Sequence, residues 1–173
     1  MGSCNLDGQV AGLASAGFEN RLRWYGGRAT LCCRRRLLCA SCNKFWRVIH
    51  EVGLTPRLFA PAEFTSLLDH GIGFTDLAKR AAGMDRQIAA NLYDLDAFAT
   101  KLNYYKPAVI AFSSKKAASV WLRSPTRRTE TGRLVRADAT SSDVFILPSP
   151  SGAAARYWSS KPWQELASWR SKT

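Results

Sequence analysis

Two short, uninterrupted apolar segments restrict the fold of this chain more than any other feature. AVIAFS (108–113) and VFIL (144–147) show almost no alternation of apolar and polar residues. Such strands are buried on both faces, which is typical of a parallel sheet covered by helices. GIGFTDL (71–77) predicts a third short strand that runs into a loop. The sequence therefore predicts an α/β fold around a parallel sheet.

Helical patterns alternate with these strands. Pro61 is a favoured first helical residue, Asp94 is a good N-cap, and glycines at 53 and 71 stop two of the patterns. Residues 123–142 are polar and basic, which predicts a loop or an irregular hairpin. The predicted helices cover 43–53, 61–71, 95–106, 114–122 and 161–170.

Parallel strands place their carboxyl ends at one edge of the sheet, where α/β proteins bind ligands. Three loops should therefore meet at that edge: 75–76, 113–116 and 148–156. Each contains polar or basic residues. We expect the functional site at this edge.

The charge is strongly unbalanced, with 25 basic and 13 acidic residues and a net charge of +12. This excess indicates a polyanionic partner, most simply nucleic acid. An arginine-rich proteome without such a partner is the alternative explanation. No apolar run reaches the roughly 18 residues of a membrane span, and the N-terminus has no secretory pattern. We therefore expect a cytoplasmic, nucleoid-associated protein that does not contact membranes.

Residues 1–42 differ from the rest of the chain. Six arginines fall between residues 21 and 36, and LCCRRRLLCASC has neither helical nor strand periodicity. The division expected is an atypical Arg- and Cys-rich segment (1–42) followed by an α/β domain (43–173). The odd number of cysteines argues against a disulfide framework, and an adjacent pair beside CxxC does not fit a zinc knuckle. The cysteines are Cys4, Cys32, Cys33, Cys39 and Cys42.

Four segments together resemble the mismatch-specific uracil/thymine-DNA glycosylases, the bacterial branch of the uracil-DNA glycosylase superfamily. They are NKFWRVIHEVGLTPRLFAP, GIGFTDLAKR, AFSSKKAASVWL and ILPSPSGAAARYW, and the resemblance covers about 43–170. It implies a three-layer α/β/α sandwich around a short, mostly parallel sheet. It also implies a monofunctional DNA repair enzyme that flips uracil or a related mispaired base from DNA and hydrolyses its N-glycosidic bond. No metal or other cofactor is implied, and we expect a monomer.

The resemblance assigns the 148–158 loop to DNA. In the family the matching loop enters the minor groove that the base has left. Ser149 and Ser151 could donate hydroxyls to phosphate or base, and Gly152 lets the backbone approach DNA closely. Ala153 to Ala155 are candidates for a blunt wedge, and Arg156 for a phosphate contact or for filling the gap. An ordinary strand-to-helix turn is the alternative, and the Tyr-Trp pair after Arg156 is expected in the core.

Other cations are expected to contact phosphates. Lys115 and Lys116 begin a helix after a strand, a position that favours anions. Lys79 and Arg80 are similar but weaker candidates. Solvated surface side chains are the alternative for all four.

Three residues are candidates for catalysis: Asn43, Asp76 and Ser149. Asn43 matches the family's Asn before an aromatic pair near the base pocket, although it could equally be a helix cap. Asp76 lies at a strand end facing the expected pocket and is the nearest carboxylate to the chemistry. Ser149 begins the DNA-binding loop.

The family's first motif, a strand ending in Gly-x-x-x-Gly with a water-positioning residue and a following aromatic, is missing. AGLASAG (11–17) resembles it weakly but lies far upstream of Asn43 and lacks the polar residue. A chain without this motif is expected to lose the central strand. In a reading frame shifted by one nucleotide, the codons of 24–28 and 37–42 can encode both halves of the motif. We hypothesise a frameshift over about 24–42; gene sequencing that shows incompatible codons would refute it.

The missing motif leaves an alternative function, a catalytically weak or inactive DNA-binding protein of the same fold. A small-molecule enzyme on a doubly wound sheet is less well supported, because no glycine-rich phosphate loop is present. A metal-bound nucleic-acid module built on the cysteines is the remaining alternative.

Overall fold

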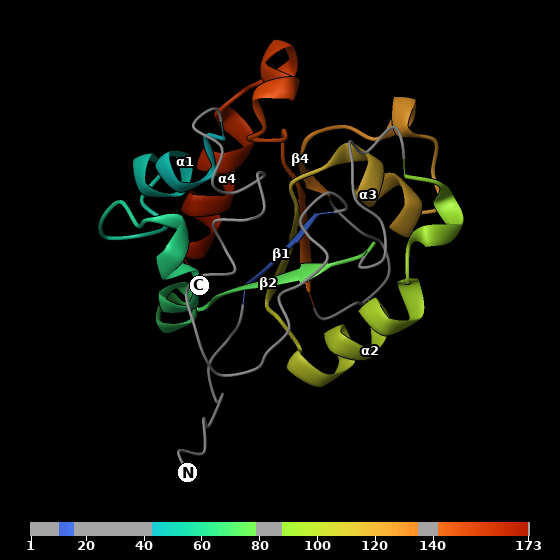
Figure 1. Cartoon of the computed structure of the whole chain (residues 1–173), viewed down its shortest axis with the longest axis horizontal. Coiled ribbons are helices and arrows are strands. Elements are labelled where there is room, and N and C mark those ends of the chain that lie inside the picture. The colour runs from blue at the N-terminus through green and yellow to red at the C-terminus, as the bar shows by residue number, and fades with distance from the viewer. Residues whose placement is uncertain (1–10, 16–42, 79–87, 135–141, 173) are drawn as a thin grey trace.

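The computed structural model describes residues 11–15, 43–78, 88–134 and 142–172. In these residues one sheet has five strands in the order β2-β1-β3-β5-β4 (Figure 1). The pairs β1–β2, β1–β3 and β3–β5 are parallel, and β4 runs antiparallel to β5. The strands are β1 (Ala11–Ser15), β2 (Ile72–Asp76), β3 (Val109–Phe112), β4 (Gly132–Leu134) and β5 (Asp143–Ile146).

The predicted helices are confirmed together with the residues that begin and end them. Pro61 opens its helix, Gly71 ends it with a φ of 64°, and the Asp94 carboxylate accepts a hydrogen bond from the Ala97 amide at 2.9 Å. The α-helices are α1 (Phe45–Glu51), α2 (Leu95–Tyr105), α3 (Lys115–Trp121) and α4 (Lys161–Arg170). The 3-10 helices in the described residues are η2 (Pro61–His70), η4 (Ala90–Leu92), η5 (Thr126–Arg128) and η6 (Gly152–Tyr157).

The two apolar strands, β3 and β5, are buried on both faces, as predicted. Residues in register, such as Ala111 and Phe145, point to the same side of the sheet. On that side they pack with Phe45 of α1 and Trp163 of α4. The neighbouring residues 110, 112, 144 and 146 pack on the other side with residues of α2 and α3. The mixed α/β fold is thus confirmed, with helices contributing to a core on each side of the sheet (Figure 1).

The expected loss of the central strand is wrong. β1 lies between β2 and β3, with Ser15 beside Asp76 and Ala14 beside Phe112. The weak AGLASAG segment therefore supplies the strand that the sequence analysis considered missing. It can do so because a strand needs only a few residues with paired backbone groups on both sides, and five are enough here.

The basic stretch after α3 contains ordered structure. β4 pairs with β5 as the hairpin alternative predicted, and the Arg133 guanidinium binds the Asp143 carboxylate at 2.7 Å. No helix of the described ranges is long and apolar enough to cross a membrane.

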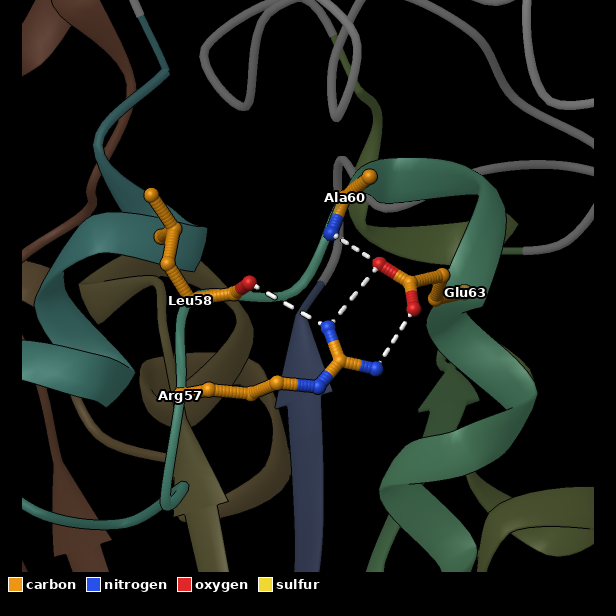
Figure 2. Close-up of polar contacts among 4 residues, drawn as sticks. All are labelled: Arg57, Leu58, Ala60 and Glu63. Atoms are coloured by element: carbon orange, nitrogen blue, oxygen red, sulfur yellow. Dashed lines mark hydrogen bonds and ion pairs between the residues drawn. The ribbon is translucent and has the colours of Figure 1, made fainter.

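A charged cluster holds the turn between α1 and η2 (Figure 2). The Glu63 carboxylate accepts hydrogen bonds from the Ala60 amide at 2.8 Å and from Arg57 at 2.6 and 3.3 Å. The Arg57 guanidinium also lies over the Phe59 ring, 3.9 Å from its centroid. The hydrogen bond from Arg57, and then that from Ala60, holds the pKa of Glu63 below its usual value. Because both charged groups are solvent-accessible, the pair sets the conformation of the turn but contributes little to the free energy of unfolding.

Candidate functional site

The carboxyl ends of β1, β2, β3 and β5 form one edge of the sheet because these strands are parallel. Ser15 and Asp76 are paired as the last residues of β1 and β2, and Phe112 and Ile146 as those of β3 and β5. Residues 113–116 and 148–156 follow β3 and β5 at this edge, as predicted, whereas residues 75–76 are the last two residues of β2 rather than a loop after it. This edge is the usual ligand site of an open α/β sheet.

The loop after β5 is held by hydrogen bonds from its own short side chains. The Ser149 hydroxyl oxygen accepts from the Ser151 amide at 3.3 Å, and the Ser151 hydroxyl oxygen accepts from the Ala153 amide at 3.4 Å, which caps η6. The buried Trp163 indole donates to the Pro148 carbonyl at 3.1 Å. Within the described residues neither serine hydroxyl donates its proton to a protein acceptor. The Trp163 indole therefore anchors the loop on the core side. Both serine hydroxyls can donate their protons to a ligand.

The start of α1 docks on this loop. The Lys44 amide donates to the Pro150 carbonyl at 2.9 Å, and the Lys44 ammonium lies 5.0 Å from the centroid of the Trp158 ring. The Asn43 carboxamide oxygen accepts from the Phe45 amide at 2.9 Å. The N-cap of α1 is Lys44, so Asn43 is not the N-cap, but its side chain pairs the amide of the first helical residue from one position earlier. The docking places Asn43 beside the 149–151 segment. Residues more than 100 positions apart in sequence meet here.

The expectation that both aromatics after Arg156 lie in the core is wrong for Tyr157. Trp158 is half-buried and stacks on Trp163, with ring centroids 6.3 Å apart. The Tyr157 side chain is instead 77% exposed, and the Arg156 guanidinium lies 5.9 Å from its ring centroid. Tyr157 ends η6 and Trp158 follows it with an extended backbone, so the two side chains leave the chain from different local conformations.

The cations predicted at the start of α3 lie at the same edge. Ser114 caps α3 through a 3.2 Å hydrogen bond from the Ala117 amide, Lys115 is exposed and Lys116 is half-buried. The predicted Lys79 and Arg80 fall outside the described residues.

Arg127 and Arg128 are two exposed cations on η5 that were not predicted as DNA contacts from the sequence. The first residue of β4, Gly132, pairs with Ile146 at the carboxyl end of β5, so the chain just before β4 lies beyond this edge. Figure 1 shows η5 and η6 on the side of the sheet toward which β5 runs. The two adjacent arginines were the available signal, but their position depends on the β4–β5 register.

The three candidate catalytic residues do not form one cluster. Asn43 and Ser149 are brought close by the Lys44–Pro150 hydrogen bond. Asp76 ends β2, and β2 and β5 are separated by β1 and β3. Three strand spacings of about 4.8 Å place β2 roughly 14 Å from β5. Asp76 therefore lies at the same edge as Ser149, but with two strands between β2 and β5.

Metal ligands do not cluster in the part of the chain that the structure describes: no group of three or more His, Cys, Asp or Glu side chains is placed to hold an ion there. The five cysteines lie outside the described residues.

Fold and site together define a class: a basic α/β protein whose serine-, glycine- and arginine-bearing loops gather at the carboxyl edge of a sheet, suited to nucleic acid. A family model described as the uracil DNA glycosylase superfamily matches residues 23–171. The chain belongs to the uracil DNA glycosylase superfamily. Membership supports a hydrolase of the DNA glycosylase type, acting on DNA in base excision repair.

Proposed function

We propose that this protein is a monofunctional, mismatch-specific uracil-DNA glycosylase of the bacterial branch, working as a monomer without a metal. Its DNA substrate contains uracil or a related mispaired base. The enzyme flips that base out and leaves an abasic site. We further propose a three-layer sandwich as the architecture, with a mostly parallel sheet to which β1 adds a strand from outside the expected 43–173 domain. The proposed location is the cytoplasm, at the nucleoid. The observation that carries the proposal is the docking of α1 on the 149–157 loop, through the Lys44–Pro150 hydrogen bond.

The loop at this edge is the proposed minor-groove contact. Ser149 and Ser151 have hydroxyl protons to donate to phosphate or base oxygens. Gly152 and Ala153 carry no side chain beyond a methyl group, which lets the backbone approach the DNA closely. Arg156 is exposed next to them and can hold a phosphate.

Phosphates on either side of the target nucleotide are the proposed partners of the remaining cations. Lys115, Lys116, Arg127 and Arg128 lie at the same edge of the sheet as the loop. Each phosphate contact releases condensed counterions, so binding should weaken as salt rises. Lys79 and Arg80 stay predicted contacts.

The proposed chemistry is hydrolysis of the bond between the base and C1′ of the sugar. As this bond breaks, its electron pair leaves with the base as an anion, the sugar becomes cationic, and a water oxygen adds to C1′. Hydrogen bonds from Asn43 and Ser149 would stabilise the departing base. Asp76, at the end of β2 on the same edge, would stabilise the cationic sugar or orient the water. Water gives one proton to solvent, and the base anion takes one up.

Release of uracil from labelled oligonucleotides tests this function. Uracil is presented in a single strand, opposite G and opposite A, and alkali then cleaves abasic sites. The controls carry cytosine in place of uracil, in the single strand and opposite G. Uracil-dependent cleavage supports the glycosylase. Salt-sensitive DNA binding without cleavage would instead identify a DNA-binding protein of the same fold that lacks the chemistry.

A further inference from the structure

The proposed DNA loop has small side chains where a flipped base would leave its gap. Ala153, Ala154 and Ala155 carry only methyl groups. A methyl group cannot replace the stacking surface of a base, and base–aromatic stacking contributes about 1–3 kcal/mol per base. A larger, flatter side chain close to this loop would supply the stacking surface that the alanines lack.

Tyr157 is such a side chain. It is the last residue of η6, directly after the three alanines and Arg156, and its side chain is 77% exposed. The neighbouring Trp158 is held by stacking on Trp163 and by the Lys44 ammonium over its ring. This anchor fixes the backbone from which the Tyr157 ring projects. The Arg156 guanidinium, 5.9 Å from the ring centroid, adds a cation to the same surface.

We propose that Tyr157 is a positioning residue for base flipping: its ring stacks on the bases beside the extruded nucleotide and takes the place of the missing base. The inference rests on the proposed function. It assigns the gap-filling contact to an aromatic ring rather than to the alanines or Arg156. A tyrosine side chain has few rotatable bonds, so ordering its ring against DNA costs less conformational entropy than ordering a long flexible side chain would.

The chain offers a matched control at the opposite edge of the sheet. Tyr104 is 79% exposed and lies in the last turn of α2, which leads into the start of β3. Its ring packs edge-on against Tyr105, with centroids 4.8 Å apart. Tyr104→Ala therefore removes an equally exposed ring from a surface that should not meet the extruded nucleotide.

Binding to a preformed gap tests the proposal without requiring catalysis. The probes are a duplex with a tetrahydrofuran abasic analogue flanked by 2-aminopurine and the same duplex without the gap. Tyr157→Ala should weaken binding to the gapped duplex roughly ten- to a hundredfold, with little change on the intact duplex. It should also abolish the quenching of 2-aminopurine that stacking produces. Tyr157→Phe should keep both properties, and Tyr104→Ala should behave like the wild type.

Two outcomes would overturn the proposal: wild-type affinity and quenching in Tyr157→Ala, or an equal loss of affinity on both duplexes. The second would mean a general contact or a structural role. If the wild type releases uracil and Tyr157→Ala binds the gapped duplex as tightly as the wild type, this inference is rejected and the glycosylase proposal stands. If binding to the gapped duplex depends on Tyr157 but no uracil is released, the stacking role of Tyr157 stands and the glycosylase proposal is rejected.

Discussion

The indole of Trp163 supports the functional loop from inside the core, so Trp163→Phe should be costly. The side chain is fully buried and packs on Phe45 and Trp158. Its indole donates to the buried carbonyl of Pro148 at 3.1 Å. Phenylalanine cannot donate, and an unpaired buried carbonyl costs about 1–3 kcal/mol. With the packing lost by the smaller ring, we expect the free energy of unfolding to fall by about 2–4 kcal/mol.

Urea unfolding followed by circular dichroism measures this loss. With an m-value of about 2 kcal/mol/M, the midpoint should fall by roughly 1–2 M. Trp169→Phe, on the same helix, is the matched control. Its indole donates to the half-buried Asp143 carboxylate, which keeps Arg133 as a partner, so we expect a loss of under about 1 kcal/mol. Equal losses in the two variants would refute the role given to the Trp163–Pro148 hydrogen bond.

Three further predictions concern the charged turn and the DNA edge. Glu63→Gln should lower the free energy of unfolding above about pH 4.3. Because the folded-state pKa of Glu63 is lowered, the stability difference between variant and wild type should disappear as pH falls through that pKa. Unfolding midpoints measured between about pH 7 and 3 would show this. Ser149→Ala should slow uracil release by about tenfold at unchanged melting temperature; a change below two- to threefold would remove Ser149 from the site. Replacing Arg127 and Arg128 with Gln should reduce the slope of log K against log salt by up to about 0.9 per lost phosphate contact, whereas Lys106→Gln, at the opposite edge, should leave it unchanged.

Elements set by local sequence were predicted well. Pro61, Asp94 and Gly71 act at the helix ends where they were expected, because capping depends on backbone groups within one turn. The strands β3 and β5 were recognised because burial on both faces leaves an uninterrupted apolar run. The three loops at the carboxyl edge followed from these strands, since parallel strands end on the same side.

The candidate site was predicted less completely. The sequence supplied Asn43 and Ser149 as separate candidates, but the hydrogen bond between Lys44 and Pro150 that brings them together is a long-range contact. Arg127 and Arg128 could not be assigned to the edge, because their position depends on how β4 pairs with β5. Tyr157 was placed in the core because aromatic residues usually are buried there, and residue type alone does not tell which of two adjacent rings turns inward.

The sequence by itself determined the periodicity of burial, the helix ends and the excess of positive charge, since each of these depends on residue type and spacing alone. Only the tertiary structure decided that residues 11–15 form an interior strand of the sheet, and that Arg127 and Arg128 lie near its carboxyl edge. The weak segment Ala11–Ser15 became an interior strand, between β2 and β3, because these two neighbours satisfy its backbone groups. Pairing across about 60 or more residues is a property of the whole chain, and no local pattern encodes it.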